Sequence, residues 1–107
     1  MSTQYLPGVY VRFREQFPAV AERVDSLGAS SDEAGPLDER TRRLVKLGIA
    51  VGAMAEGAVR SSTRKALELG IAEEEIFHVV ALTATTCGFP ATVAAFSWIE
   101  EVLAARG

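Results

Sequence analysis

The sequence contains one histidine, His78, which is the candidate for proton transfer. His78 can gain or lose a proton near neutral pH, as a general acid or base must. Glu74 stands four residues before it and Thr85 seven residues after it, so a helix would place all three on one face. We expect His78 to be the catalytic residue and Thr85 to bind substrate. The alternative is that His78 is hydrogen-bonded inside a helix packing or a subunit seam.

Two further polar side chains lie in the segment AEGAVRSSTRKALELG (residues 55–70). Ser62 falls on the small, apolar side of the predicted helix, and Arg60 falls on the charged side. We expect both to bind substrate, because a hydroxyl can hydrogen-bond a ligand and an arginine fork fits a carboxylate. In the alternatives, Ser62 bonds a backbone carbonyl one turn back or acts as a nucleophile with His78, and Arg60 pairs with carboxylates of its own face.

The sequence contains one cysteine, Cys87. One thiol cannot form an intrachain disulfide, a CxxC redox pair or a cysteine-based zinc site. No base or cation adjoins Cys87 in the sequence, so we expect a small core residue beside a helix end rather than a reactive thiol. We expect neither a metal site nor a cofactor.

Composition and charge limit the classes of function. The 107 residues are 49% hydrophobic and 23% charged, a globular composition at the apolar end of the range. Apolar residues beyond what one small core can hide favour a homo-oligomer. The net charge of −3 offers no basic excess for nucleic acid, and we interpret the basic residues within 40–46 as a solvated helix face.

Targeting and membrane segments are not expected. The first residues, MSTQYLPGVYV, lack the positive start and the long apolar run of a secretory signal. The most apolar segment, residues 76–84, is far shorter than a membrane span and contains a histidine. We therefore expect a cytoplasmic protein that binds neither membrane nor nucleic acid.

The pattern of apolar and helix-breaking residues predicts an all-α fold. Residues 8–27 predict two short helices, or one helix kinked at Pro18. Three apolar side chains of this segment are expected to point inward: Val20, Val24 and Leu27. The run GASSDEAGP (residues 28–36) predicts a linker, and no segment shows the alternation of a strand.

Four helices are expected after the linker, over residues 39–53, 55–69, 73–87 and from residue 90 onward. Asp38 would cap the first, and Gly70 would end the second. The third is apolar around nearly its whole circumference, so we expect it to be buried, either centrally or between subunits. The fourth carries two apolar stripes, which indicates two neighbours.

Three segments together resemble the carboxymuconolactone decarboxylase and alkylhydroperoxidase-D-like family. They are LDERTRRLVKLGIAVG, AVRSSTRKALELGIAEEEI and GFPATVAAF, within residues 36–104. The resemblance implies an alkylhydroperoxidase-D-like helical bundle of about five to six helices that assembles as a trimer or hexamer. Because the linker joins an N-terminal arm to the main body and the chain is too short for two ordinary domains, we expect one domain over residues 1–107, with the helical arm and linker at 1–35 and a core at 36–107.

The redox branch of this family uses a Glu, two cysteines in CxxC spacing and a His. The resemblance places these positions at Arg43, Ala55, Ala58 and Ser62. Thiol peroxidase chemistry needs a thiolate and a resolving thiol, and neither stands there. The resemblance therefore implies a protein that binds or acts on a small carboxylate or lactone in a pocket between helices or subunits, without that chemistry. The alternative is a non-catalytic scaffold or ligand-binding member.

Overall fold

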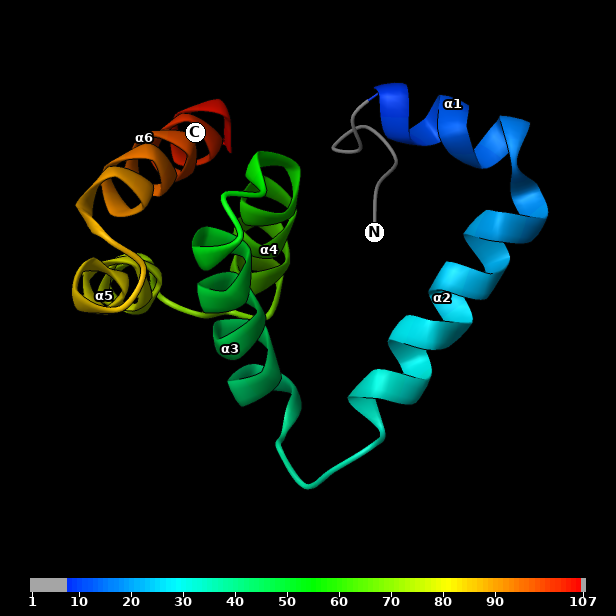
Figure 1. Ribbon diagram of the computed structural model, residues 1–107, viewed down its shortest axis with the longest axis horizontal. Coiled ribbons are helices and arrows are strands. Elements are labelled where there is room, and N and C mark those ends of the chain that lie inside the picture. Colours follow the sequence, from blue (N-terminus) through cyan, green and yellow to red (C-terminus); the bar gives the residue numbers. More distant parts are fainter. Residues whose placement is uncertain (1–7, 107) are drawn as a thin grey trace. The chain divides into compact units, whose positions relative to one another are not determined.

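The computed structural model describes residues 8–106, and all regular structure in this range is helical (Figure 1). The elements are α1 (Gly8–Gln16), α2 (Pro18–Asp32), α3 (Glu39–Gly52), α4 (Glu56–Glu68), α5 (Glu73–Leu82), the 3₁₀ helix η2 (Thr83–Thr85) and α6 (Phe89–Arg106). This confirms the all-α prediction. None of the described helices is long and apolar enough to cross a membrane.

Two compact units divide the chain at the connection between α2 and α3. In the N-terminal unit, α1 and α2 meet at Phe17, whose backbone (φ −127°, ψ 64°) leaves the helical region just before Pro18 begins α2. Proline fits this position because the first helical residue needs no N–H bond. Arg14 of α1 donates two hydrogen bonds, of 3.0 and 2.6 Å, to the Asp25 carboxylate of α2.

Helix α2 differs from its prediction in length and in orientation. It runs to Asp32, and the Glu33 N–H still bonds to the Ala29 carbonyl at 3.1 Å, so the start of the predicted linker is wrong. Glycine and serine cost a helix only about 0.5–1 kcal/mol each, which a helix already formed can absorb. The inward orientation is also wrong. The exposed fractions are 48% for Val20, 59% for Val24 and 69% for Leu27.

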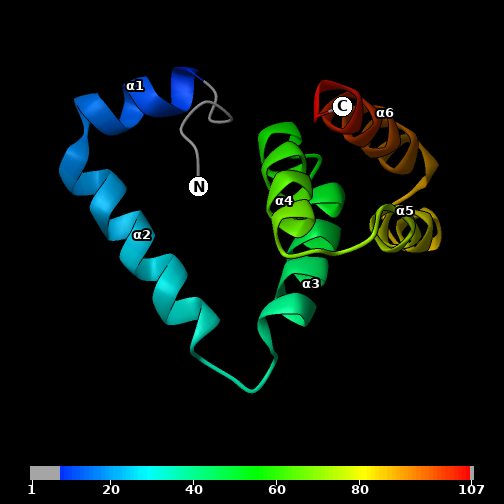
Figure 2. The same cartoon turned by 180° about the vertical axis from the view of Figure 1, so that it is seen from behind.

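The second unit is built on the pair α3 and α4, which lie side by side in both views (Figures 1 and 2). The Asp38 carboxylate accepts the Thr41 N–H at 2.8 Å and begins α3, as predicted. Gly70 follows α4 with φ +80°, a conformation that favours glycine, as predicted. In the turn between the helices, Met54 also has a positive φ, of 53°.

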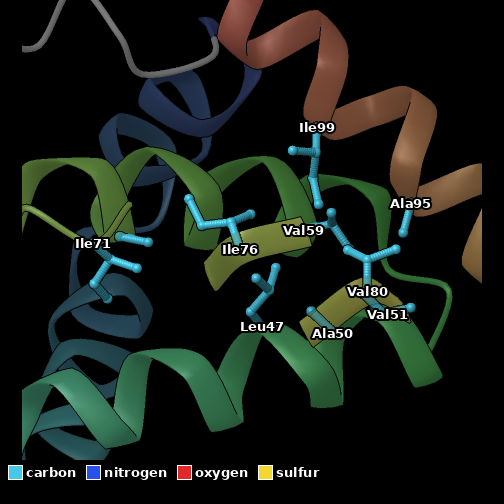
Figure 3. Packing of buried hydrophobic residues seen from close by; sticks show 10 residues of the cluster. Leu47, Ala50, Val51, Val59, Ile71, Ile76, Val80, Ala95 and Ile99 are labelled. Atoms are coloured by element: carbon cyan, nitrogen blue, oxygen red, sulfur yellow. The ribbon is translucent and has the colours of Figure 1, made fainter. Parts of the chain in front are cut away.

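One apolar cluster holds the four helices of this unit together. Its side chains converge from α3, α4, α5 and α6 and from the connection between α4 and α5 (Figure 3). They are Leu47, Ala50, Val51, Val59, Ala66, Ile71, Ile76, Val80, Ala95 and Ile99. Because each helix contributes buried apolar surface, the position of α3 against α4 is fixed by packing rather than by the turn alone.

Helix α5 is shorter and less buried than predicted. It ends at Leu82 instead of near Cys87, and only Ile76 and Val80 among its residues are buried. The Thr83 hydroxyl donates to the Val80 carbonyl at 2.6 Å, and the backbone then tightens into the 3₁₀ helix η2. Central burial of the whole helix is therefore wrong within this chain, whereas burial between subunits stays a prediction.

Candidate functional site

A contact between α3 and α4 brings together two positions that the family resemblance relates to the redox centre. The Arg43 guanidinium donates a hydrogen bond from Nη1 to Ser62 Oγ at 3.2 Å. Ser62 lies in the middle of α4 and is only 6% exposed, which confirms its predicted inward position. Arg43 lies in the second turn of α3 and is half-buried. A cation therefore faces the buried hydroxyl.

The neighbouring hydroxyl of Thr63 behaves differently. Thr63 is fully buried, and its Oγ1 donates to the carbonyl of Val59, one turn back, at 2.8 Å. This local bond is the alternative that the sequence offered for Ser62, and Thr63 makes it instead. The Ser62 hydroxyl hydrogen enters no hydrogen bond within residues 8–106. Since Ser62 Oγ already accepts from Arg43, the pair presents donors to a ligand.

Arg43 bonds to a neutral hydroxyl, whereas two other arginines of the same unit bond to carboxylates. Arg40 forms an ion pair with Glu75, and Arg60 forms ion pairs with two carboxylates. Over the part of the chain that the structure describes, Arg43 makes no ion pair. A half-buried guanidinium whose partner is a neutral hydroxyl keeps most of its five donors and its charge for an anion.

Arg60, which we expected to bind substrate, joins α4 to α6. Its Nη2 donates to Glu101 of α6 at 2.7 Å, and its Nε donates to Glu56 of α4 at 3.0 Å. The hydrogen bond to Glu101, and after it the bond to Glu56, raises the pKa of Arg60 above its usual value. This is the pairing with carboxylates that the sequence offered as the alternative.

His78 and Thr85 lie on exposed surface. His78 is placed midway between Ile76 and Val80, the buried residues of α5, and so on the opposite side of that helix. Among the described residues, no hydrogen bond or ion pair joins His78 or Thr85 to Ser62, and none joins His78 to Glu74. The structure therefore brings Ser62 to Arg43, but it does not bring His78 or Thr85 into contact with that pair.

Small residues also stand at the two positions where the resemblance places the cysteines of the redox branch. Ala55 is the residue before α4, and Ala58 lies in its first turn, exposed. Cys87 is half-buried, and a Cβ built on Gly52 would lie 3.1 Å from its Sγ, so the thiol sits beside the end of α3. Within residues 8–106, no three His, Cys, Asp or Glu side chains gather in a way that could hold a metal ion.

The protein is thus all-α, and its candidate site is the Arg43–Ser62 contact between α3 and α4. The carboxymuconolactone decarboxylase family matches residues 18–101, from the start of α2 into α6. The chain therefore belongs to this family. The match confirms the resemblance that the three sequence segments carried.

One solved structure has a similar fold, and two curated proteins are similar in sequence. The crystal structure of apo-lpg0406 from Legionella pneumophila, a carboxymuconolactone decarboxylase family protein, is similar with a TM-score of 0.77 at 21% identity. The similarity covers 92% of this chain and 88% of that one. Two uncharacterized proteins of Methanocaldococcus jannaschii are also similar. MJ0742 is 29% identical over 83% of this chain and 86% of its own length, and MJ1511 is 32% identical over 83% of each.

Proposed function

We propose that this chain is a carboxymuconolactone decarboxylase-like protein that binds a small carboxylate or lactone acid at Arg43 and Ser62, without thiol peroxidase chemistry. The observation that carries the proposal is the hydrogen bond from Arg43 to the buried Ser62 hydroxyl. The ligand would lie against the α3–α4 pair, in a pocket between helices or subunits.

The chemistry of the pair favours an anionic ligand with two oxygen acceptors. A guanidinium presents parallel N–H groups that match the two oxygens of a carboxylate, and such charge-assisted bonds are the stronger ones. The Ser62 O–H can donate to a third acceptor, such as a lactone carbonyl. Arg43 would turn from Ser62 to the ligand at little cost, because the bond that it gives up is a single one to a neutral group.

The residues at the former redox positions support the absence of thiol chemistry. A thiol peroxidase uses one thiolate to attack the peroxide and a second thiol to resolve the sulfenic acid. Ala55 and Ala58 stand where the resemblance places those two cysteines, and Cys87 is the chain's single thiol.

We give ligand binding precedence over catalysis because of where His78 lies. The side chain is exposed, on the side of α5 opposite the buried Ile76 and Val80. Within the described chain it makes no hydrogen bond to Ser62. Proton transfer by His78 stays a prediction, which His78→Ala tests in a decarboxylation assay, and substrate binding by Thr85 stays a prediction as well.

Calorimetric titration with benzoate and with a muconolactone-type acid tests the binding proposal. We expect wild-type protein to bind at least one acid, and Arg43→Gln to bind it about 10- to 100-fold more weakly, since a hydrogen bond to a charged group contributes about 1.5–3 kcal/mol. Arg64→Gln is the matched control, because Arg64 is a half-buried arginine on α4 outside the pair. Unchanged binding by Arg43→Gln, or no binding of either acid to wild type, would overturn the site.

A peroxide assay with a dithiol donor tests the second part of the proposal separately. We expect wild type and Cys87→Ala to be equally inactive. Turnover that disappears in Cys87→Ala would show cysteine chemistry and contradict the proposal.

A further inference from the structure

The Ser62 hydroxyl lies among apolar side chains and has one hydrogen left to donate. Its neighbours about one turn before and one turn after it on α4 are Val59 and Ala66, which are both fully buried. Ser62 is 6% exposed, and its hydrogen enters no hydrogen bond within the described residues. In apolar surroundings an O–H gains more from an acceptor than it does in water. A ligand oxygen small enough to reach Ser62 therefore adds to the affinity.

The guanidinium of Arg43 can bind an acid while it stays on Ser62. Its Nη1 donates to Ser62 Oγ at 3.2 Å, which uses one of its five N–H groups. Because Nη1 carries two hydrogens, one of them can bond to Ser62 and the other to a carboxylate oxygen. A ligand that bonds to both side chains thus finds them already in place, which reduces the cost of ordering them.

The geometry of the pair limits where such a ligand carries its further acceptor. Two oxygens bonded to the two hydrogens of one guanidinium nitrogen lie about 5 Å apart, because the bonds diverge by roughly 120° and each spans about 3 Å. An oxygen that accepts from the Ser62 O–H lies about 2.7 Å from Oγ. The most direct bridge between the hydroxyl and the carboxylate is therefore an acceptor about 2.5–3 Å from each of the two oxygens.

Oxygens on adjacent carbon atoms have this separation. With bonds of about 1.23 Å for C=O and about 1.52 Å for C–C, two carbonyl oxygens on the same side of a 2-oxo acid lie about 2.8 Å apart. We infer that the acid bound here is a 2-oxo acid, whose carboxylate bonds to Arg43 and whose keto oxygen accepts from Ser62. A keto oxygen only accepts, as a site that presents donors requires. The inference rests on the proposed function and names its substrate class.

The two side chains then have different roles. Arg43 holds the carboxylate that every acid has, whereas Ser62 distinguishes an acid with a keto oxygen from one without it. An acid with a methylene group at that carbon leaves the Ser62 O–H without an acceptor. One hydrogen bond between neutral groups corresponds to a difference in affinity of about 3- to 10-fold.

NMR titration of the full-length protein with two matched pairs of acids tests the inference. Pyruvate and propionate differ only in the keto group, and so do benzoylformate and phenylacetate. We expect wild type to bind the keto acid of at least one pair about 3- to 10-fold more tightly than its partner. Ser62→Ala should abolish this preference by weakening the keto acid, whereas its affinity for propionate and phenylacetate should stay unchanged. Alanine suits a helix interior, and circular dichroism checks that the variant remains helical.

Ser61→Ala is the matched control, because Ser61 is a half-buried serine on the same helix, outside the pair. It should keep the wild-type preference. Equal binding of both acids by wild type would overturn the inference and leave the proposed function standing, and so would a preference that survives in Ser62→Ala. Weakening of both acids alike in Ser62→Ala would show a structural role and overturn it too. If wild type binds none of the four acids, the site at Arg43 and the inference both fail.

Discussion

The hydroxyl of Ser62 and the guanidinium of Arg43 show what a sequence pattern can and cannot predict for single residues. The inward position of Ser62 followed from its row on α4, where Val59 is also buried. The contact with Arg43 did not follow, because Arg43 shares the polar side of α3 with Arg40. A helical period places a Cα atom on a face, whereas a long side chain can carry its charge several ångströms from there.

Glu75 is the residue from which a pH dependence follows. Its carboxylate pairs with Arg40 of α3 and accepts the Ala72 N–H at 2.9 Å. Arg40 first, and then the Ala72 N–H, hold the pKa of Glu75 below its usual value. A lowered pKa in the folded state stabilises the fold above the unfolded pKa, which is about 4.3 for Glu, and this contribution disappears as the pH falls through the folded value. We predict that acidification lowers the unfolding temperature less steeply in Glu75→Gln than in wild type.

Thermal unfolding followed between pH 7 and pH 2.5 measures this difference. Some slope should remain in Glu75→Gln, because Arg14 also lowers the pKa of Asp25 and the Thr41 N–H lowers that of Asp38. Glu74→Gln, an exposed neighbour on the same turn, is the control and should keep the wild-type profile. A Glu75→Gln profile that coincides with wild type would contradict the role assigned to the carboxylate.

At the scale of elements, two glycines of the α4 region should respond in opposite directions to the same change. Gly57 lies in the first turn of α4 and Gly70 follows the end of α4 with φ +80°, and a Cβ would meet no atom within 4 Å at either position. Backbone conformation alone therefore decides the outcome. We predict that Gly70→Ala destabilises the protein by about 1–2 kcal/mol. Gly57→Ala should stabilise it by about 0.5–1 kcal/mol. Urea unfolding followed by circular dichroism measures the free energy of unfolding of both variants. If both changes had the same sign, backbone conformation would not be the deciding factor.

The helix types and most starting points could be predicted, but two helix ends could not. Asp38 and Gly70 act locally, so the sequence shows the boundaries that they set. The end of α5 depends on Thr83, whose hydroxyl bonds to the Val80 carbonyl and lies 2.8 Å from the Thr92 hydroxyl of α6. The contact with Thr92 forms only after α6 has packed, so local pattern does not show it.

At the scale of the whole molecule, the pattern identified apolar helix faces but not what covers them. Val24 was expected to point into a core because its spacing is that of a buried stripe, and it is exposed. The same spacing serves a face that packs on its own chain and a face that packs on another copy. The apolar excess in the composition predicted a homo-oligomer, and this stays a prediction.

The connection from residue 33 to residue 38 should also be the site where a protease first cleaves the chain. All six of its residues are exposed and lie outside helices, whereas the ten residues of the apolar cluster lie between Leu47 and Ile99. Limited digestion with a glutamate-specific protease should therefore cut first after Glu33. The fragment that begins at Ala34 should resist further cleavage and keep its helical signal, which mass spectrometry and circular dichroism of the digest would measure. A first cut within α3–α6 would show that the second unit does not stand alone as a folded piece.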